Sequence, residues 1–120
     1  MTADRRAAEA RGRWAERIAA LALRIKGYRI LARRFRVGAG EIDLIARRGG
    51  QLVAVEVKAR SDLVTALESI SLRQRQRIND AMEIFCQRHR ALAGLPWRFD
   101  VVVVRPGRWP RHIVDAWRDD

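Results

Sequence analysis

Residues 40 to 58 are GEIDLIARRGGQLVAVEVK, and this stretch decides the fold. The two runs Glu41–Arg48 and Gln51–Lys58 alternate and are rich in β-branched residues, and only Gly49 and Gly50 separate them. This pattern predicts a β-hairpin. A two-residue glycine turn suits type I′ geometry and fixes the register of the two strands.

That register places four polar side chains together. Counting outward from the turn, Asp43 should face Glu56, and Glu41 should face Lys58. Directly opposed residues share one side of a sheet, so all four side chains are expected to project from the same side. The apolar neighbours should fill the other side: Ile42, Leu44, Val53, Val55 and Val57.

The opposed acids need a compensating charge. Two carboxylates with Cβ atoms roughly 4.5 to 5.5 Å apart repel each other. A divalent cation such as Mg²⁺ would relieve this repulsion, because Mg²⁺ is typically held by one or two carboxylates. The alternative is a salt bridge between Glu41 and Lys58, with Asp43 and Glu56 merely solvated. The apolar run around Glu56 favours the cation, because it indicates a sheet covered on both sides, where an unpaired charge is costly.

Length and composition limit the classes of protein to which the chain could belong. With 120 residues and 48% hydrophobic content, the chain should form a single domain over residues 1–120. No run approaches the roughly 18 apolar residues of a membrane span, and the first residues lack a signal-peptide core, so we expect a cytoplasmic protein. The single cysteine, Cys86, has no metal-ligand partners at suitable spacing and should be a core residue.

The charge balance points to a polyanionic partner. The net charge is +11, and all but two of the 25 lysines and arginines are arginine. Genomic base composition could explain why arginine replaces lysine, but not why basic residues outnumber acidic ones. Nucleic acid is therefore the expected partner.

The expected element order is helix, three strands, helix, two strands. The first helix should present an apolar stripe of Trp14, Ile18, Leu21 and Ile25, widened by small residues, with Glu16 at the edge of the apolar arc. The expected elements are a helix at Ala3–Lys26, a strand at Tyr28–Arg36, the hairpin, a polar loop at Ala59–Asp62, a helix at Ser71–Leu92, and strands at Trp97–Arg105 and Arg111–Trp117.

The second helix has a core stripe and a basic arc. Ile78, Met82 and Phe85 mark the stripe, and Gln74 precedes it by one turn. Arg73 and Arg77 lie on the opposite arc, where they could face phosphates or simply be solvated.

The order of these motifs resembles a known superfamily. An acid on the first helix, an aspartate on a strand and an acid-x-lysine on the next strand resemble the PD-(D/E)xK nucleases. GEIDLIA followed by VAVEVKAR, with GYRILARRFR before and RFDVVVV after, is similar to the YraN-like family within that superfamily. The resemblance runs from about Gly12 to Trp117. It implies an α/β fold of the restriction-endonuclease type, with a mixed sheet of about five strands flanked by helices, and a relation to Holliday junction resolvases.

The resemblance also implies roles. Asp43 and Glu56 would bind Mg²⁺ or Mn²⁺, with the Val57 carbonyl as a further ligand, and Lys58 would lie near the attacking water. Glu16 matches the first-helix acid and would hold a water molecule beside the cation or a second ion. Glu41 would serve as partner of Lys58 or as an additional acid. Family members often carry a lysine early in the second helix, where this chain has Gln74, which removes a positive charge from the wall of the site.

The combined expectation is a metal-dependent nuclease or nuclease-like protein that acts on nucleic acid, expected to be DNA, through its structure rather than its base sequence. The alternative is a nucleic-acid-binding or scaffold module that keeps the fold and the charge but does not cut. A third interpretation is a protein-interaction domain, which predicts no salt-dependent binding to nucleic acid. The sequence leaves the choice among duplex, flap, junction and RNA substrates open. It also leaves the oligomeric state open, although junction cleavage would favour a homodimer.

Overall fold

The hairpin forms the middle of the sheet. In the computed structural model, which describes residues 2–60 and 62–117, strands β2 (Gly40–Arg48) and β3 (Gln51–Ala59) pair antiparallel with Arg48 opposite Gln51. Only Gly49 of the two turn glycines has a positive φ, at 58°. This matches a type II′ turn rather than the expected type I′. Both types have two-residue loops, so the register near the turn is the expected one.

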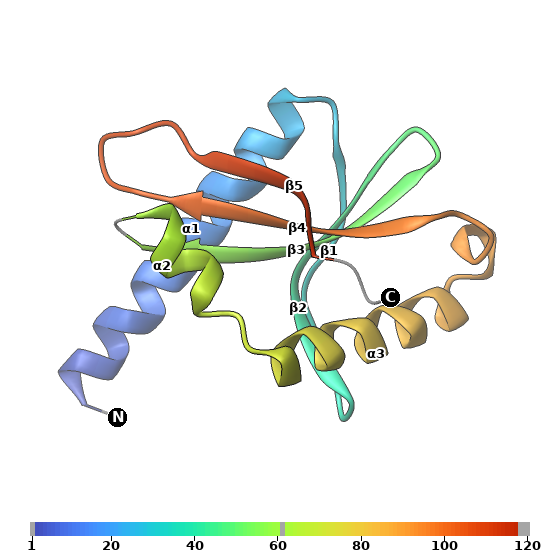
Figure 1. Ribbon diagram of the computed structural model, residues 1–120, viewed down its shortest axis with the longest axis horizontal. Helices are drawn as coiled ribbons and strands as arrows, with labels where there is room; N and C mark the ends of the chain where they lie inside the picture. Colours follow the sequence, from blue (N-terminus) through green and yellow to red (C-terminus); the bar gives the residue numbers. More distant parts are fainter. Residues whose placement is uncertain (1, 61, 118–120) are drawn as a thin grey trace.

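Five strands make one mixed sheet in the order β1-β2-β3-β4-β5 (Figure 1). The outer strands are β1 (Arg29–Val37), β4 (Trp97–Val104) and β5 (Arg111–Trp117). β3 and β4 run parallel, and every other neighbouring pair is antiparallel. The parallel pair requires a crossover, which the helices after β3 supply. The predicted mixed α/β sheet with flanking helices is confirmed.

Helices cover both faces of this sheet. α1 (Ala3–Ile25) packs on one face, and α2 (Leu63–Glu68) and α3 (Leu72–Arg88) pack on the other (Figure 1). α2 was not expected; Asp62, the last residue of the predicted loop, caps it by accepting a hydrogen bond from Thr65 N. Residue 61 of that loop lies outside the described residues. α3 ends at Arg88 and is followed by a short 3₁₀ turn, η1 (Arg90–Leu92), so the predicted end at Leu92 was too late.

The face that α1 turns to the sheet consists mainly of small residues. Ala15, Ala19 and Ala20 are fully buried with Leu23. Trp14, Leu21 and Ile25 are 42%, 53% and 63% exposed, so these three residues of the predicted stripe face solvent, whereas Ile18, the fourth, packs against the core. Small side chains allow the helix to lie close to the strands, which explains why the alanine arc is the buried one.

The core on the α3 face contains the stripe expected for that helix. Ile78, Met82 and Phe85 are buried there against Ile42 and Ile45 of β2, and Cys86 lies half-buried at the margin. No helix within the described residues combines the length and apolar character that crossing a lipid bilayer requires.

Candidate functional site

The two hairpin strands separate at Asp43. Their predicted register holds for five pairs, from Arg48 and Gln51 to Leu44 and Val55, but the ladder does not reach Asp43 and Glu56. Instead, the Asp43 carboxylate accepts a hydrogen bond from the backbone N–H of Val57 at 2.8 Å. β3 continues beyond this point only as the partner of β4. The side chain of Asp43 thus takes the place of a backbone partner where the sheet opens.

The regular alternation of sides also breaks at Asp43. Ile42 packs under α3, as Ile45 does, whereas Leu44 packs under α1. The expectation that Ile42 and Leu44 share one side is therefore wrong. The pairing of β1 with β2 skips Arg34 and Asp43, and Arg34 has a φ of 48°, a left-handed conformation that is rare for a non-glycine residue.

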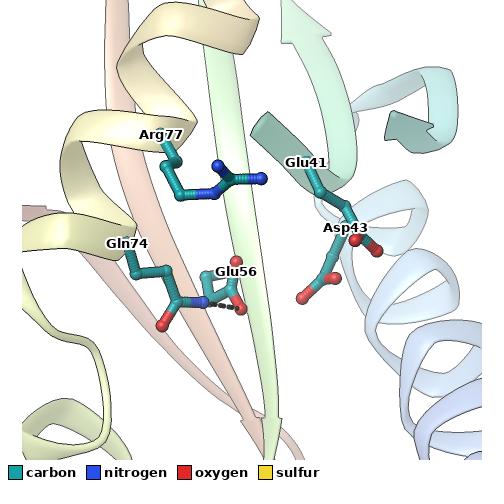
Figure 2. Close-up of a pocket in the computed structure, with 5 residues that line it drawn as sticks. All are labelled: Glu41, Asp43, Glu56, Gln74 and Arg77. Carbon is teal, nitrogen blue, oxygen red and sulfur yellow. Dashed lines mark hydrogen bonds between the residues drawn. The ribbon is translucent and has the colours of Figure 1, made fainter. Parts of the chain in front are cut away.

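Side chains from three elements meet where the strands separate. They line a cavity of about 290 Å³ made by Glu41 and Asp43 of β2, Glu56 of β3, and Gln74 and Arg77 of α3 (Figure 2). Gln74 Nε2 donates a hydrogen bond to Glu56 Oε1 at 2.8 Å. Figure 2 shows the Arg77 guanidinium extending from α3 toward the two acids of β2.

The position of α3 over this cavity depends on Gly40. A Cβ atom at Gly40 would overlap the backbone carbonyl oxygen of Arg77. The absence of a side chain lets α3 rest directly on the first residue of β2. Ser71 caps the same helix by accepting a hydrogen bond from Gln74 N. Close approach and capping together place Gln74 and Arg77 on the cavity wall.

The acids of the cavity are held in an environment that disfavours their charge. Glu56 is 7% exposed, and burial, together with the charge of Asp43, raises its pKa to about 8 against the opposing effect of Lys58. Burial also raises the pKa of Asp43, and the charges of Glu16 and Glu41 add to this, although the Val57 N–H bond opposes it. Both carboxyl groups therefore gain from a nearby proton or cation.

Asp100 provides a contrast within the same sheet. Among the described residues, Glu56 and Asp100 are the two buried charged ones. Burial would raise the pKa of Asp100, but hydrogen bonds from His112, from Arg98 and from Asp115 N outweigh it, and the pKa is lowered. Arg98 and His112 lie 2.9 and 2.7 Å from its carboxylate oxygens. Asp100 is thus a satisfied structural acid, whereas Glu56 has the perturbed pKa typical of a functional site.

Lys58 and Glu41 do not form the expected pair. Lys58 Nζ lies 3.6 Å from Glu56 Oε1. Glu41 instead pairs with Arg36 Nε at 3.1 Å and lies opposite Arg36 in β1. The salt bridge of Glu41 with Lys58 is therefore wrong, because the hairpin has opened before these residues and β1 is the nearer partner.

Glu16 lies beside the cavity rather than in its wall. Its carboxylate accepts a hydrogen bond from Arg34 Nε at 2.7 Å, and its charge acts on Asp43 as described above. Of the other residues singled out from the sequence, Arg73 is exposed and does not line the cavity. The structure thus brings together five predicted residues, with Lys58 and Glu16 adjacent: Glu41, Asp43, Glu56, Gln74 and Arg77.

Comparison with known proteins places the chain in a family. Residues 15–104 match the model of the uncharacterised protein family UPF0102. The chain belongs to the UPF0102 family. A UPF0102 protein of Maricaulis maris is 55% identical over 117 residues, which cover 98% of this chain and 92% of the relative. A UPF0102 protein of Paramagnetospirillum magneticum is 52% identical, with 95% and 92% covered. These matches confirm the YraN-like assignment.

Three arginines near the site were not singled out from the UPF0102 sequence. Arg34 and Arg36 lie on β1 and bind acids of the neighbouring elements, and Arg13 lies on α1 near Glu16. In a chain this rich in arginine, composition alone gives no signal for them. The φ of Arg34 and the pairing of β1 with Glu41 depend on tertiary structure.

Proposed function

We propose that this UPF0102 protein is a nuclease that uses Mg²⁺ or Mn²⁺ to hydrolyse phosphodiester bonds in DNA, branched DNA included. The observation that carries the proposal is the convergence of Asp43 and Glu56, both with raised pKa, on one polar cavity beside Lys58. The expected sequence pattern and the +11 net charge agree with it.

The donor set fits a hard divalent cation. Asp43 and Glu56 supply two carboxylates, which is the number that Mg²⁺ commonly takes from a protein. Val57 adds a third oxygen, because the N–H and C=O of one strand residue point to the same edge, and its N–H already faces Asp43. Among the described residues no cluster of three or more His, Cys, Asp or Glu side chains is suited to a metal, so the set depends on this carbonyl and on water.

Each group then has a role in hydrolysis. A bound cation would neutralise charge on the phosphoryl oxygens and assist the attacking water. Lys58 is close enough to Glu56 to orient that water or to stabilise the phosphate. Arg77 projects into the cavity and would contact a phosphate oxygen through its guanidinium. Glu16, held by Arg34, would hold a further water or ion near Asp43.

A second candidate is a nucleic-acid-binding module that does not cut. The observation that favours it is the bond from Gln74 to Glu56, which satisfies one carboxylate oxygen at 2.8 Å without a cation. Both candidates predict binding to DNA, but only the nuclease requires the acids and a metal.

A cleavage panel separates the two. Single-stranded, duplex and branched DNA would be incubated with the wild type, Asp43→Asn and Lys58→Ala in Mg²⁺, in Mn²⁺ and in chelator. The nuclease predicts metal-dependent cleavage by the wild type and loss in both variants, with DNA binding retained in chelator. Binding without cleavage of any substrate would establish the binding module instead.

A further inference from the structure

A second cavity lies between α1 and β1. Its volume is about 330 Å³. The lining residues are Glu9, Gly12, Arg13 and Glu16 of α1 and Arg34 and Arg36 of β1. We call this the α1–β1 groove. It adjoins the first cavity, because Arg36 in its wall pairs with Glu41, which lines the first cavity.

The charges of the groove favour an anion. Its lining carries three arginines and two glutamates. Arg34 is paired with Glu16 at 2.7 Å, and Arg36 with Glu41 at 3.1 Å. Arg13 and Glu9 line the groove and make no ion pair within residues 2–60 and 62–117, so the Arg13 guanidinium is available to an oxyanion. Arginine binds phosphate in a bidentate manner, which makes a phosphate group the natural ligand.

Gly12 gives an independent reason to expect a ligand here. Glycine is among the poorest helix-forming residues, yet Gly12 lies in the interior of α1. A Cβ atom at this position would meet no atom of the chain within 4 Å, so internal packing does not require glycine. The missing side chain keeps the groove open on the α1 side. Glycine in such a wall is typical where a ligand approaches the backbone closely.

The backbone of Arg34 adds a third observation. Its φ of 48° is strained for an arginine and occurs where β1 skips its pairing with Asp43. Strained residues of this kind cluster at binding and catalytic sites. Here the conformation coincides with the ion pair to Glu16, and both residues line the groove.

We propose that the α1–β1 groove binds a backbone phosphate of the DNA strand next to the phosphate that lies at Asp43 and Glu56, with Arg13 as the principal contact. The identity of the ligand as DNA rests on the proposed function. The groove extends the path of the strand from α3 and Arg77, across the opening between β2 and β3, to the N-terminal half of α1.

DNA binding measured in chelator tests whether the positive charge of Arg13 contacts a phosphate. Affinity for a duplex and a branched DNA would be measured over a range of salt concentrations for the wild type, Arg13→Ala and Arg11→Ala. Arg11 is the matched control, because it lies about 160° around the helix from Arg13. Arg13→Ala should weaken binding and reduce the log–log salt slope by about 0.9, whereas Arg11→Ala should leave both unchanged. Equal slopes for the wild type and Arg13→Ala would overturn the proposal.

A substitution at Gly12 tests whether DNA occupies the α1–β1 groove. Gly12→Leu should preserve or raise the melting temperature, because leucine favours the helix and the position has room, but it should weaken DNA binding severalfold by filling the groove. Ala7→Leu, about 140° around α1, is the control and should not affect binding. A Gly12→Leu protein that is stable and binds DNA like the wild type would refute the groove.

The outcomes distinguish this inference from the proposed function. Suppose that the wild type binds DNA and the two groove variants bind it more weakly, but no substrate is cut. The proposal of nuclease activity is then wrong, and the proposal that the groove binds DNA is supported. If the wild type cuts DNA and the groove variants bind DNA like the wild type, the proposal for the groove is wrong and the proposal of nuclease activity is supported. Absence of DNA binding by the wild type even at low salt would overturn both.

Discussion

Among single residues, Asp43 both completes the hydrogen bonding of the β3 backbone and contributes a carboxylate to the first cavity. Its carboxylate replaces a backbone partner for Val57 N–H, and it also lies among other acids that raise its pKa. Because the folded-state pKa lies above the ordinary value, ionisation of Asp43 at neutral pH costs folding free energy. A cation bound by Asp43 and Glu56 would remove that cost.

Asp43→Asn should therefore have two opposite effects. The amide oxygen can still accept the Val57 N–H bond while the buried charge is gone, so the metal-free protein should be at least as stable as the wild type. The stabilisation by Mg²⁺ or Mn²⁺ should disappear; for the wild type it is expected to reach about 2.7 kcal/mol at a hundred times the dissociation constant. Thermal unfolding with and without metal measures both.

Asp100→Asn is the matched control for a buried acid. The pKa of Asp100 is lowered, so its ionised form stabilises the fold above the ordinary pKa, and the amide should cost about 1.5 to 3 kcal/mol. This variant should keep the metal response. An unchanged metal response in Asp43→Asn, or a loss of stability equal to that of Asp100→Asn, would contradict the assignment of Asp43.

The sequence predicted the residues of the site better than their contacts. Counting from Gly49 and Gly50 gave the right register as far as Leu44 and Val55, and Asp43 and Glu56 follow next to each other beyond the end of the ladder. It could not predict that the ladder ends at Leu44, since the opening depends on the skipped pairing of Arg34 on another strand.

At the scale of elements, the contact between α3 and β2 positions half of the cavity. Gly40→Ala would force its Cβ into the Arg77 carbonyl, and backbone cannot move aside as a side-chain tip can. The substitution should cost roughly 1 to 3 kcal/mol or more, and it should shift Gln74 and Arg77 away from the acids.

Gly38→Ala provides the comparison for this prediction. A Cβ atom at Gly38 would meet nothing within 4 Å, and its φ is not positive, so the change should stay within about 0.5 kcal/mol. Denaturant unfolding measures both variants. Equal stabilities for Gly40→Ala and Gly38→Ala would show that α3 does not rest on Gly40.

Elements with long periodic patterns were the predictable ones. α1 and all five strands match their predicted bounds to within one or two residues, and α3 begins as predicted but ends four residues earlier than expected. α2 was missed because its six residues make fewer than two turns and have no full amphipathic repeat. On α1 the predicted apolar arc contains the buried Ala15, Ala19 and Leu23, but the burial expected for Trp14, Leu21 and Ile25 is wrong, because close packing on the sheet selects the small residues.

For the whole molecule, the net charge of +11 should make the affinity for DNA depend strongly on the salt concentration. The affinity for DNA should fall linearly with salt on logarithmic axes, with a slope set by the number of phosphates that are neutralised. Arg77 projects into the first cavity, and Arg73 is exposed one turn earlier on α3. Both are expected to lie along the same strand of DNA.

Arg73→Ala and Arg77→Ala should each reduce the log–log slope of DNA affinity against salt concentration by about 0.9, measured with duplex DNA in chelator. Arg77→Ala should also impair cleavage in the presence of metal, because the Arg77 guanidinium faces the acids of the cavity. Arg108→Ala is the matched control: Arg108 is exposed in the turn that joins β4 to β5, far along the sheet from α3 (Figure 1). If the three variants lower the slope equally, the DNA contacts the protein through its overall charge and not through α3. If none changes the slope, α3 is not part of the binding surface, and the path of the strand across the first cavity would be wrong.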